Sequence, residues 1–205
     1  AGLTSDKSCQ LYPDLAQTIN VDCLRVLNAM SHRIPRRIFL SSAAVFGGET
    51  AYVKAKRECE EMLKGTNWTI LRPGSVCGYS PRMRFDLPVN AMTRDAMLKG
   101  EITVNGGGQT RTNVHITDLC DTIKALFVCE GGLYNLNAEN LTILETAQKV
   151  AALTHAAIRV LDYSDNRSYS MRSDLPTTRK VDDAIRDIVV KFKTGYWKDA
   201  LTNPV

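Results

Sequence analysis

The sequence predicts an α/β protein in which helices cover both faces of a parallel sheet. Segments whose apolar residues recur every three or four positions alternate with short apolar runs, and this alternation is typical of such a sheet. At 205 residues, 44% of them apolar, the chain is long enough for one compact domain with a smaller lobe beside it. The expected strands are 38–42, 69–73, 102–104, 112–116, 133–136 and 158–161, and the expected helices are 15–30, 52–64, 87–98, 118–128, 144–153 and 181–192.

Residues that favour helix ends mark several of these boundaries. Gly65 and Gly100 each follow an expected helix, and glycine is common there because it adopts positive φ without strain. Thr142, with Glu145 three residues later, predicts a capping box at the start of the next helix. His155 ends that helix, where we expect it to contact terminal carbonyl groups rather than to act in catalysis.

Composition argues against a membrane protein, a metalloprotein and a nucleic-acid-binding protein. No apolar run approaches the roughly 20 residues that cross a bilayer, and no Cys, His and carboxylate cluster has metal-ligand spacing. The six cysteines form no Cys-x-x-Cys pair, so we expect free buried thiols in a reducing compartment, the cytoplasm. A net charge of +4 with 7% aromatic residues is too little for a basic face with aromatic platforms.

Residues 37–78 hold the candidate catalytic residues. Ser42 ends the first of two short apolar strands, and we expect this first strand to be buried. Tyr52 and Lys56 begin the helix between the two strands. Residues four apart share a helix face, so Lys56 supplies a cation that lowers the pKa of the Tyr52 phenol from its usual ~10. Ser42 then holds a substrate oxygen while Tyr52 transfers its proton, which suits hydride and proton transfer at a sugar-like alcohol.

The Tyr-x-x-x-Lys spacing by itself is a weak signal, because an exposed helix can carry an ordinary Tyr/Lys pair. Its context favours the catalytic interpretation. It occurs once in the sequence, between a strand that ends in two serines and a strand that ends in Leu-Arg-Pro-Gly.

The same region and several later segments together resemble one enzyme family. The motifs are Ser-Ala-Ala-Val-Phe-Gly from Ser42, Leu-Arg-Pro-Gly-Ser-Val-Cys-Gly from Leu71, Gln-Thr-Arg-Thr-Asn-Val-His-Ile around Arg111 and Asp-Asn-Arg-Ser-Tyr around Arg167. They resemble the extended short-chain dehydrogenase/reductase family, in its NAD-dependent sugar epimerase/dehydratase branch, across nearly the whole chain.

This resemblance implies a Rossmann-like, doubly wound parallel sheet with a smaller C-terminal substrate-binding lobe. Residues 1–78 would complete the dinucleotide-binding domain, and 79–205 would mix the rest of the core with that lobe. The implied catalytic residues are Ser42, Tyr52 and Lys56. The implied cofactor-binding residues are Ala1, Gly2, Leu3, Asn20, Ser41, Tyr52, Lys56, Pro73, Gly74, Ser75 and Val76, and the implied substrate-binding residues are Ser42, Ser75, Asn90, Arg111 and Arg167.

One element of the family is missing from these 205 residues. The family opens with a strand, a Gly-x-x-Gly-x-x-Gly turn and a helix that together hold the cofactor pyrophosphate. The cluster 106–108 precedes another strand rather than a helix, so we expect a hairpin or loop there. The connections at 48–51 and 172–177 are also short for the family. We expect that the sequence omits residues of the natural polypeptide, with a truncated gene product as the alternative.

The resemblance implies an NAD(P)-dependent enzyme that acts on a nucleotide-linked sugar, with NAD as the first expectation and NADP also open, and a homodimer. Epimerisation is favoured over 4,6-dehydration, because dehydratases of the family commonly carry an acidic pair where this chain has Ala43 and Ala44. Arg82, Arg84 and Arg111 fit an anionic ligand, since guanidinium forks match phosphate oxygens. Simple sugar reduction or dehydrogenation remains open. The alternatives are a non-catalytic binding or regulatory module of the same fold and, on the basic pI alone, an RNA-binding relative.

Overall fold

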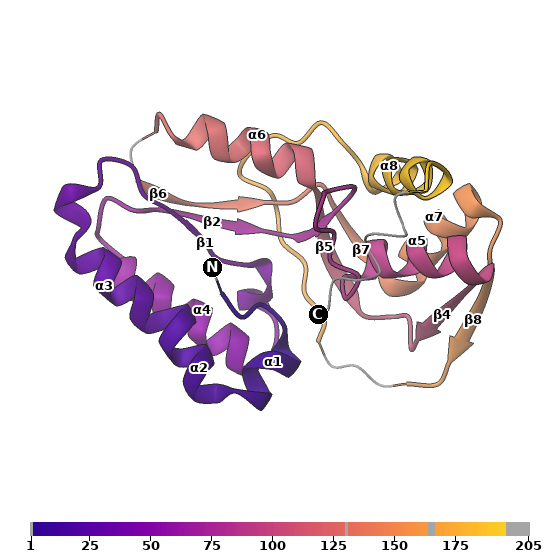
Figure 1. The fold of residues 1–205 in the computed structure, drawn as a ribbon, viewed down its shortest axis with the longest axis horizontal. Coiled ribbons are helices and arrows are strands. Elements are labelled where there is room, and N and C mark those ends of the chain that lie inside the picture. Colours follow the sequence, from indigo (N-terminus) through magenta and orange to yellow (C-terminus); the bar gives the residue numbers. More distant parts are fainter. Residues whose placement is uncertain (1, 130, 164–166, 196–205) are drawn as a thin grey trace.

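The computed structural model describes residues 2–129, 131–163 and 167–195 as alternating helices and strands (Figure 1). Within these ranges, no helix is both long and apolar enough to cross a membrane. In chain order the elements are α1 (Asp6–Leu11), α2 (Pro13–Gln17), the π-helix η1 (Thr18–Asp22), α3 (Cys23–Ala29), the 3₁₀-helix η2 (Ser31–Arg33), β1 (Ile38–Leu40), the 3₁₀-helix η3 (Ala43–Phe46), α4 (Ala51–Leu63), β2 (Thr69–Pro73), β3 (Ser75–Cys77), α5 (Pro88–Lys99), β4 (Glu101–Asn105), β5 (Thr110–His115), α6 (Ile116–Leu126), β6 (Gly132–Leu136), β7 (Glu139–Thr142), α7 (Ile143–Thr154), β8 (Ala157–Leu161) and α8 (Val181–Lys193).

The first lobe contains a sheet of three parallel strands in the order β1-β2-β6. Leu40 of β1 is in register with Leu71 of β2. Helices α1–α4 cover one face of this sheet and α6 covers the other, which confirms the predicted α/β arrangement (Figure 1). The expectation that the first strand is buried was wrong, because β1 is an edge strand of the described sheet and Leu40 is 41% exposed.

The second lobe combines the sheet β3-β5-β7 with the strand pair β4-β8 and helices α5, α7 and α8 (Figure 1). Strands β3 and β5 are parallel, whereas β7 is antiparallel to β5. The core of this lobe is an apolar cluster that includes the fully buried Ile102, Val104, Val150 and Ile185. Because α6 and β6 return to the first lobe between β5 and β7, the two lobes are interleaved in sequence.

Most of the predicted helix ends are confirmed. Gly100 follows the last residue of α5 directly and adopts φ of 68°. Gly65 follows Lys64, the residue that caps α4, and adopts φ of 74°. Thr142 and Glu145 form the predicted capping box of α7, and His155 closes that helix with φ of 60°. The helix expected over 15–30 differs, because the π-turn η1 separates α2 from α3.

Two strands, β3 and β7, were not predicted. β3 follows Gly74 directly, and a Cβ at Gly74 would lie 3.0 Å from the backbone nitrogen of Asn113 on β5. The absence of a side chain at position 74 therefore lets β3 run close against β5. His115, expected to be half-buried, is 1% exposed. Its Nδ1 accepts a hydrogen bond from the Thr117 backbone at the start of α6, and its Nε2 lies 3.1 Å from Asp187.

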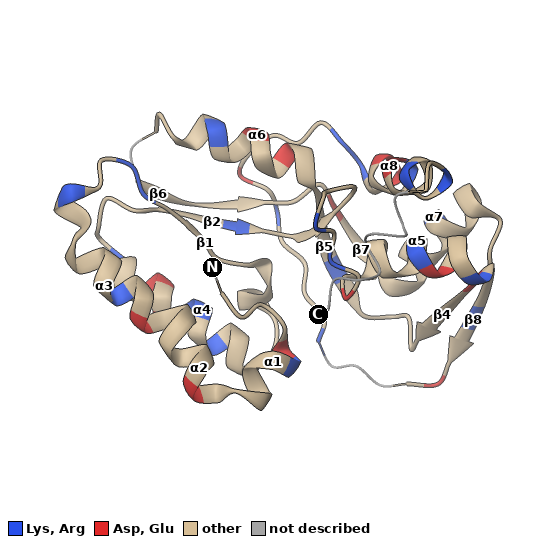
Figure 2. Ribbon diagram, in the orientation of Figure 1, with Lys and Arg blue, Asp and Glu red and all other residues tan. Residues whose placement is uncertain are grey.

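Charged residues of both signs share the same helices. Figure 2 shows basic and acidic residues together on α4, α5, α6 and α8. Glu49 and Arg57 form an exposed pair at 2.5 Å at the start of α4, and Lys149 and Asp182 form a pair at 2.8 Å between α7 and α8. The exposed Glu49–Arg57 pair contributes little to the free energy of unfolding.

All six cysteines are free, as expected. Cys9, Cys59 and Cys77 are buried, whereas the other three are exposed, so the expected burial is found for half of them. Burial raises the pKa of the Cys77 thiol to about 12.

Candidate active site

Ser42, Tyr52 and Lys56 lie together at the C-terminal end of β1. Thr50 sets the start of α4, because its hydroxyl accepts a hydrogen bond from the Val53 backbone at 3.3 Å. Tyr52 and Lys56 therefore occupy the first two turns of this helix. Ser42 and Tyr52 line the same cavity, where the Ser42 hydroxyl acts to lower the pKa of the Tyr52 phenol. The Lys56 ammonium lies 5.7 Å from the centre of the Tyr52 ring.

The surroundings of Tyr52 favour the protonated phenol. Burial raises the pKa of Tyr52, while the hydrogen bond with Ser42 and the positive charge of Arg84 act in the opposite direction. The expectation that a neighbouring lysine brings this pKa below its usual value was wrong in direction. Burial also lowers the pKa of Lys56, and Cys59 and Glu60 partly offset that effect.

A cavity of about 730 Å³ opens where the C-terminal ends of β1 and β2 meet the second lobe. This volume is typical of small-molecule sites, and the carboxyl ends of parallel strands are their usual place in an open α/β sheet. The predicted site residues that line it are Ser41, Ser42, Tyr52, Pro73, Gly74, Ser75, Val76, Arg111 and Arg167.

Five other predicted site residues do not line this cavity: Gly2, Leu3, Asn20, Lys56 and Asn90. The Asn20 amide holds the backbone of Leu3, with hydrogen bonds of 2.8 Å from Leu3 N and 2.9 Å to Leu3 O. Lys56 lies behind Tyr52 and donates to the Leu40 carbonyl at 2.7 Å. Ala1 is outside the described residues.

Asn90, predicted as a substrate contact, connects two backbone segments instead. Its side chain is buried, and its Oδ1 accepts a hydrogen bond from Gly78 N at 3.2 Å. Its Nδ2 donates to the Arg84 carbonyl at 3.0 Å. Asn90 therefore holds the loop that presents Arg84, and the structure does not bring its amide into the cavity.

Arg111 and Arg167, the two arginines predicted to bind substrate, contact each other in the cavity wall. Arg111 is 9% exposed, and its NH1 donates to the carbonyls of Thr110 and Arg167. Its guanidinium carbon lies 5.3 Å from the centre of the Tyr169 ring. Arg167 reaches across to the first lobe and pairs with Asp6 at 3.3 Å.

Asp86 and Tyr169 are among the residues of the cavity wall that were not predicted. Asp86 receives both arms of the Arg84 guanidinium, at 2.9 Å from Nε and 2.5 Å from NH2. Burial raises the pKa of Asp86, but the hydrogen bonds and charge of Arg84 outweigh it and hold the pKa below its usual value. Tyr169 packs so closely on Gly47 that a Cβ there would lie 2.6 Å from the ring. The Arg-x-Asp spacing on a loop was the available signal for Asp86, whereas the Tyr169 contact depends on tertiary packing.

No family model matches this sequence, and no curated protein matches it. Solved structures are similar in fold. TunA, an NAD-dependent NDP-hexosamine 5,6-dehydratase of tunicamycin biosynthesis, is 20% identical with a TM-score of 0.79, over 97% of this chain and 75% of that one. The UDP-glucose 4-epimerase of Thermus thermophilus, in complex with NAD, is 20% identical with a TM-score of 0.71, over 92% and 76%. The L-threonine dehydrogenase of Phytophthora infestans is 16% identical with a TM-score of 0.80, over 95% and 77%. The chain therefore has the Rossmann-like fold of extended short-chain dehydrogenases.

Proposed function

We propose that this protein is an NAD(P)-dependent enzyme that oxidises and reduces a nucleotide-linked sugar, with epimerisation as the favoured net reaction. The observation that carries the proposal is that Ser42 and Tyr52 both line one cavity of about 730 Å³ at the strand ends. The fold and the activities named for the similar structures support the kind of chemistry. The hydroxyl pair supports its location.

Tyr52 is the proposed acid and base at the reacting sugar oxygen. As the phenolate it would accept the hydroxyl proton, and as the phenol it would return a proton to the carbonyl formed. Ser42 would hydrogen-bond to the same oxygen, because it lines the cavity together with Tyr52. The nicotinamide cofactor supplies the hydride acceptor and donor when bound.

The wall on the Tyr52 side fits the nicotinamide half of a dinucleotide. Ser41 and the segment 73–76 present hydroxyl and backbone groups to the cavity beside Tyr52. Lys56 has three N–H donors, one of which the structure shows bonded to the Leu40 carbonyl. We propose that Lys56 also donates to the nicotinamide ribose. The pyrophosphate-binding turn is not among the 205 residues, so the sequence does not distinguish NAD from NADP.

The opposite wall fits an anionic substrate end. Arg84, Arg111 and Arg167 all line the cavity, and guanidinium groups bind phosphate oxygens through paired hydrogen bonds. Ala43 and Ala44 leave no acidic pair beside Ser42, which favours epimerisation over dehydration. We further propose that the working form is a homodimer in the cytoplasm.

A binding or regulatory module without turnover is the second candidate. The observation that favours it is the raised pKa of Tyr52, because a protonated phenol is not a base. The two candidates differ in whether the phenolate forms when cofactor and substrate are bound.

The test is to mix the purified protein with NAD and either UDP-glucose or L-threonine, and to follow the absorbance of reduced nicotinamide and the sugar products. The proposal predicts reduction or epimerised product with UDP-glucose and not with L-threonine. Turnover of L-threonine alone would overturn the substrate class. Binding of NAD and UDP-glucose without any turnover would favour the binding module.

A further inference from the structure

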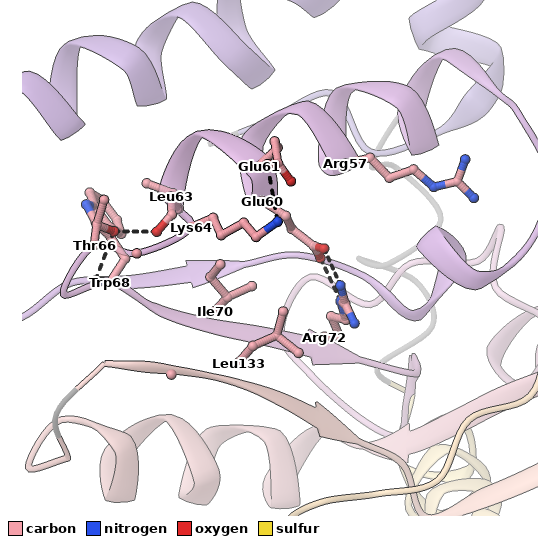
Figure 3. A pocket seen from close by; sticks show the side chains of 12 residues that line it. Arg57, Glu60, Glu61, Leu63, Lys64, Thr66, Trp68, Ile70, Arg72 and Leu133 are labelled. Atoms are coloured by element: carbon pink, nitrogen blue, oxygen red, sulfur yellow. Dashed lines mark hydrogen bonds and ion pairs between the residues drawn. The ribbon is translucent and has the colours of Figure 1, made fainter.

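A second hollow, of about 460 Å³, lies between the C-terminal half of α4 and strands β2 and β6 and contains a buried charged pair (Figure 3). Figure 3 shows the carboxylate of Glu60 pointing from α4 to the guanidinium of Arg72 on β2. Arg72 donates to both carboxylate oxygens, with its Nε at 2.8 Å. The two side chains are 10% and 17% exposed, so this fork is largely shielded from water.

The same carboxylate also reaches the catalytic strand end. The Ser41 hydroxyl donates to Glu60 Oε1 at 2.5 Å. Ser41 is itself fixed to β2, because its backbone N–H donates to the Leu71 carbonyl at 2.8 Å. Glu60 thus connects α4 to β1 and, through Arg72, to β2.

Three side chains of α4 lie against three consecutive residues, Leu40 at the end of β1 and the two serines that follow it. Tyr52, Lys56 and Glu60 are four residues apart and share one helix face. The Lys56 ammonium donates to the Leu40 carbonyl and the Glu60 carboxylate accepts from the Ser41 hydroxyl, while Tyr52 lies in the cavity wall with Ser42, whose hydroxyl acts to lower its pKa. A shift or rotation of α4 along the strand end would break these contacts together.

We infer that Glu60, fixed by Arg72, is a positioning residue that sets the register of α4 against the strand ends and so holds Tyr52 against Ser42. Glu60 and Arg72 line the hollow of Figure 3 and are not among the residues that line the catalytic cavity, so they act through Ser41 and the helix. The inference rests on the proposed function for its catalytic consequence. Its geometric consequence, the placement of Tyr52 beside Ser42, can be measured without any turnover.

The test compares Glu60→Gln with the matched control Glu49→Gln. Glu49 is also a glutamate paired with an arginine near the start of α4, but its side chain is 70% exposed and contacts neither Ser41 nor β2 in the described structure. Glutamine keeps the shape and the acceptor oxygen of glutamate and removes the charge. The readout is the NMR titration of Tyr52 in protein with ring-labelled tyrosine, assigned by the loss of its signal in Tyr52→Phe.

We expect Glu60→Gln to raise the pKa of Tyr52 further, because a displaced helix moves the phenol away from the Ser42 hydroxyl that favours the phenolate. Turnover of UDP-glucose should fall about 10- to 100-fold through kcat with little change in KM, since the misplaced group is catalytic and not substrate-binding. Glu49→Gln should change neither quantity. If Glu60→Gln unfolds the protein, the Arg72→Gln, Glu60→Gln double variant removes both buried charges and should give a folded protein with the same Tyr52 shift.

An unchanged Tyr52 titration in a folded Glu60→Gln or double variant would overturn the inference, even if the melting temperature fell. A shifted titration in a protein that never turns over UDP-glucose would uphold the positioning role and refute the proposed function. The two claims therefore fail by different measurements.

Discussion

The Lys56 ammonium donates a hydrogen bond of 2.7 Å to the carbonyl oxygen of Leu40, the last residue of β1. This bond ties the second turn of the catalytic helix to the strand end, while the ammonium remains 5.7 Å from the Tyr52 ring centre. The positive charge that partly offsets the burial-raised pKa of Tyr52 in this structure belongs instead to Arg84. Lys56 therefore links the helix to the strand end, whereas Arg84 acts on the pKa of Tyr52.

Replacement of Tyr52 by phenylalanine tests the assigned acid and base. Turnover should fall about 10²- to 10⁴-fold, because the proton-transfer group is lost. Binding of NAD, measured by calorimetry, should stay within a few-fold of the wild-type value. Tyr12→Phe is the matched control, since Tyr12 is 60% exposed and does not line the cavity. Unchanged turnover in Tyr52→Phe would refute the role.

The pH dependence of the oxidation step should follow the Tyr52 phenol. Because burial raises its pKa, the neutral phenol dominates at neutral pH and the phenolate fraction increases as the pH rises. The rate of nicotinamide reduction should therefore increase with pH through the neutral range and level off only above the pKa. Stopped-flow rates measured across this range would show the increase, and a flat profile would exclude Tyr52 as the base.

Arg84→Gln should weaken both substrate binding and catalysis. KM for a nucleotide sugar should rise about tenfold with the loss of a charge-assisted contact. The value of kcat at neutral pH should also fall, because the Arg84 charge favours the Tyr52 phenolate. Arg82 is exposed and does not line the cavity, so Arg82→Gln is the control and should leave both parameters unchanged. Equal effects of the two variants would mean that only the general positive charge matters.

Asp118→Asn should lower the free energy of unfolding and change its pH dependence. The Asp118 carboxylate accepts hydrogen bonds from the backbone and side chains of Thr178 and Arg179, at 2.8 to 3.0 Å. Burial raises the pKa of Asp118, but these bonds outweigh it and the pKa is lowered. Its stabilisation is therefore fully present above the unfolded-state pKa of about 4 and is lost as the pH falls through the lower folded-state pKa.

Urea unfolding should give a loss of about 2 kcal/mol for Asp118→Asn at neutral pH. The difference between wild type and variant should shrink below about pH 4. A difference that stays constant with pH would show that the carboxylate charge is not the cause.

Thr142→Ala should cost about 1 kcal/mol of stability, because it removes the capping box of α7. Thr142→Ser keeps the hydroxyl and should recover most of this loss. Chemical denaturation of both variants is the measurement, and equal losses would point to the methyl group rather than to the cap.

Elements with strong local signals could be predicted from the sequence. The helices that end at Gly65 and Gly100, the capping box at Thr142 and the strand Thr69–Pro73 all depend on residues close in sequence, and the structure contains them. The parallel sheet with helices on both faces followed from their alternation. Ser42 and Tyr52 line one cavity, and their catalytic roles stay a prediction.

Features that depend on distant residues were not predictable. The roles of Asn20 and Asn90 in holding the Leu3 and Gly78 backbones appear only when loops far apart in sequence meet. The direction of the Tyr52 pKa shift depends on how deeply tertiary packing buries the phenol, which no local pattern encodes. The open edge of β1 likewise reflects which strands pair, not the apolar composition of residues 38–40.

The most direct test of the central claim is native mass spectrometry of the purified natural protein, with a denatured spectrum of the same sample to give the mass of the chain alone. The account predicts a native species heavier by one NAD or NADP per chain, retained in Tyr52→Phe and depleted by charcoal treatment. A native mass per chain equal to the denatured mass, even after incubation with excess NAD and NADP, would contradict the proposed enzyme.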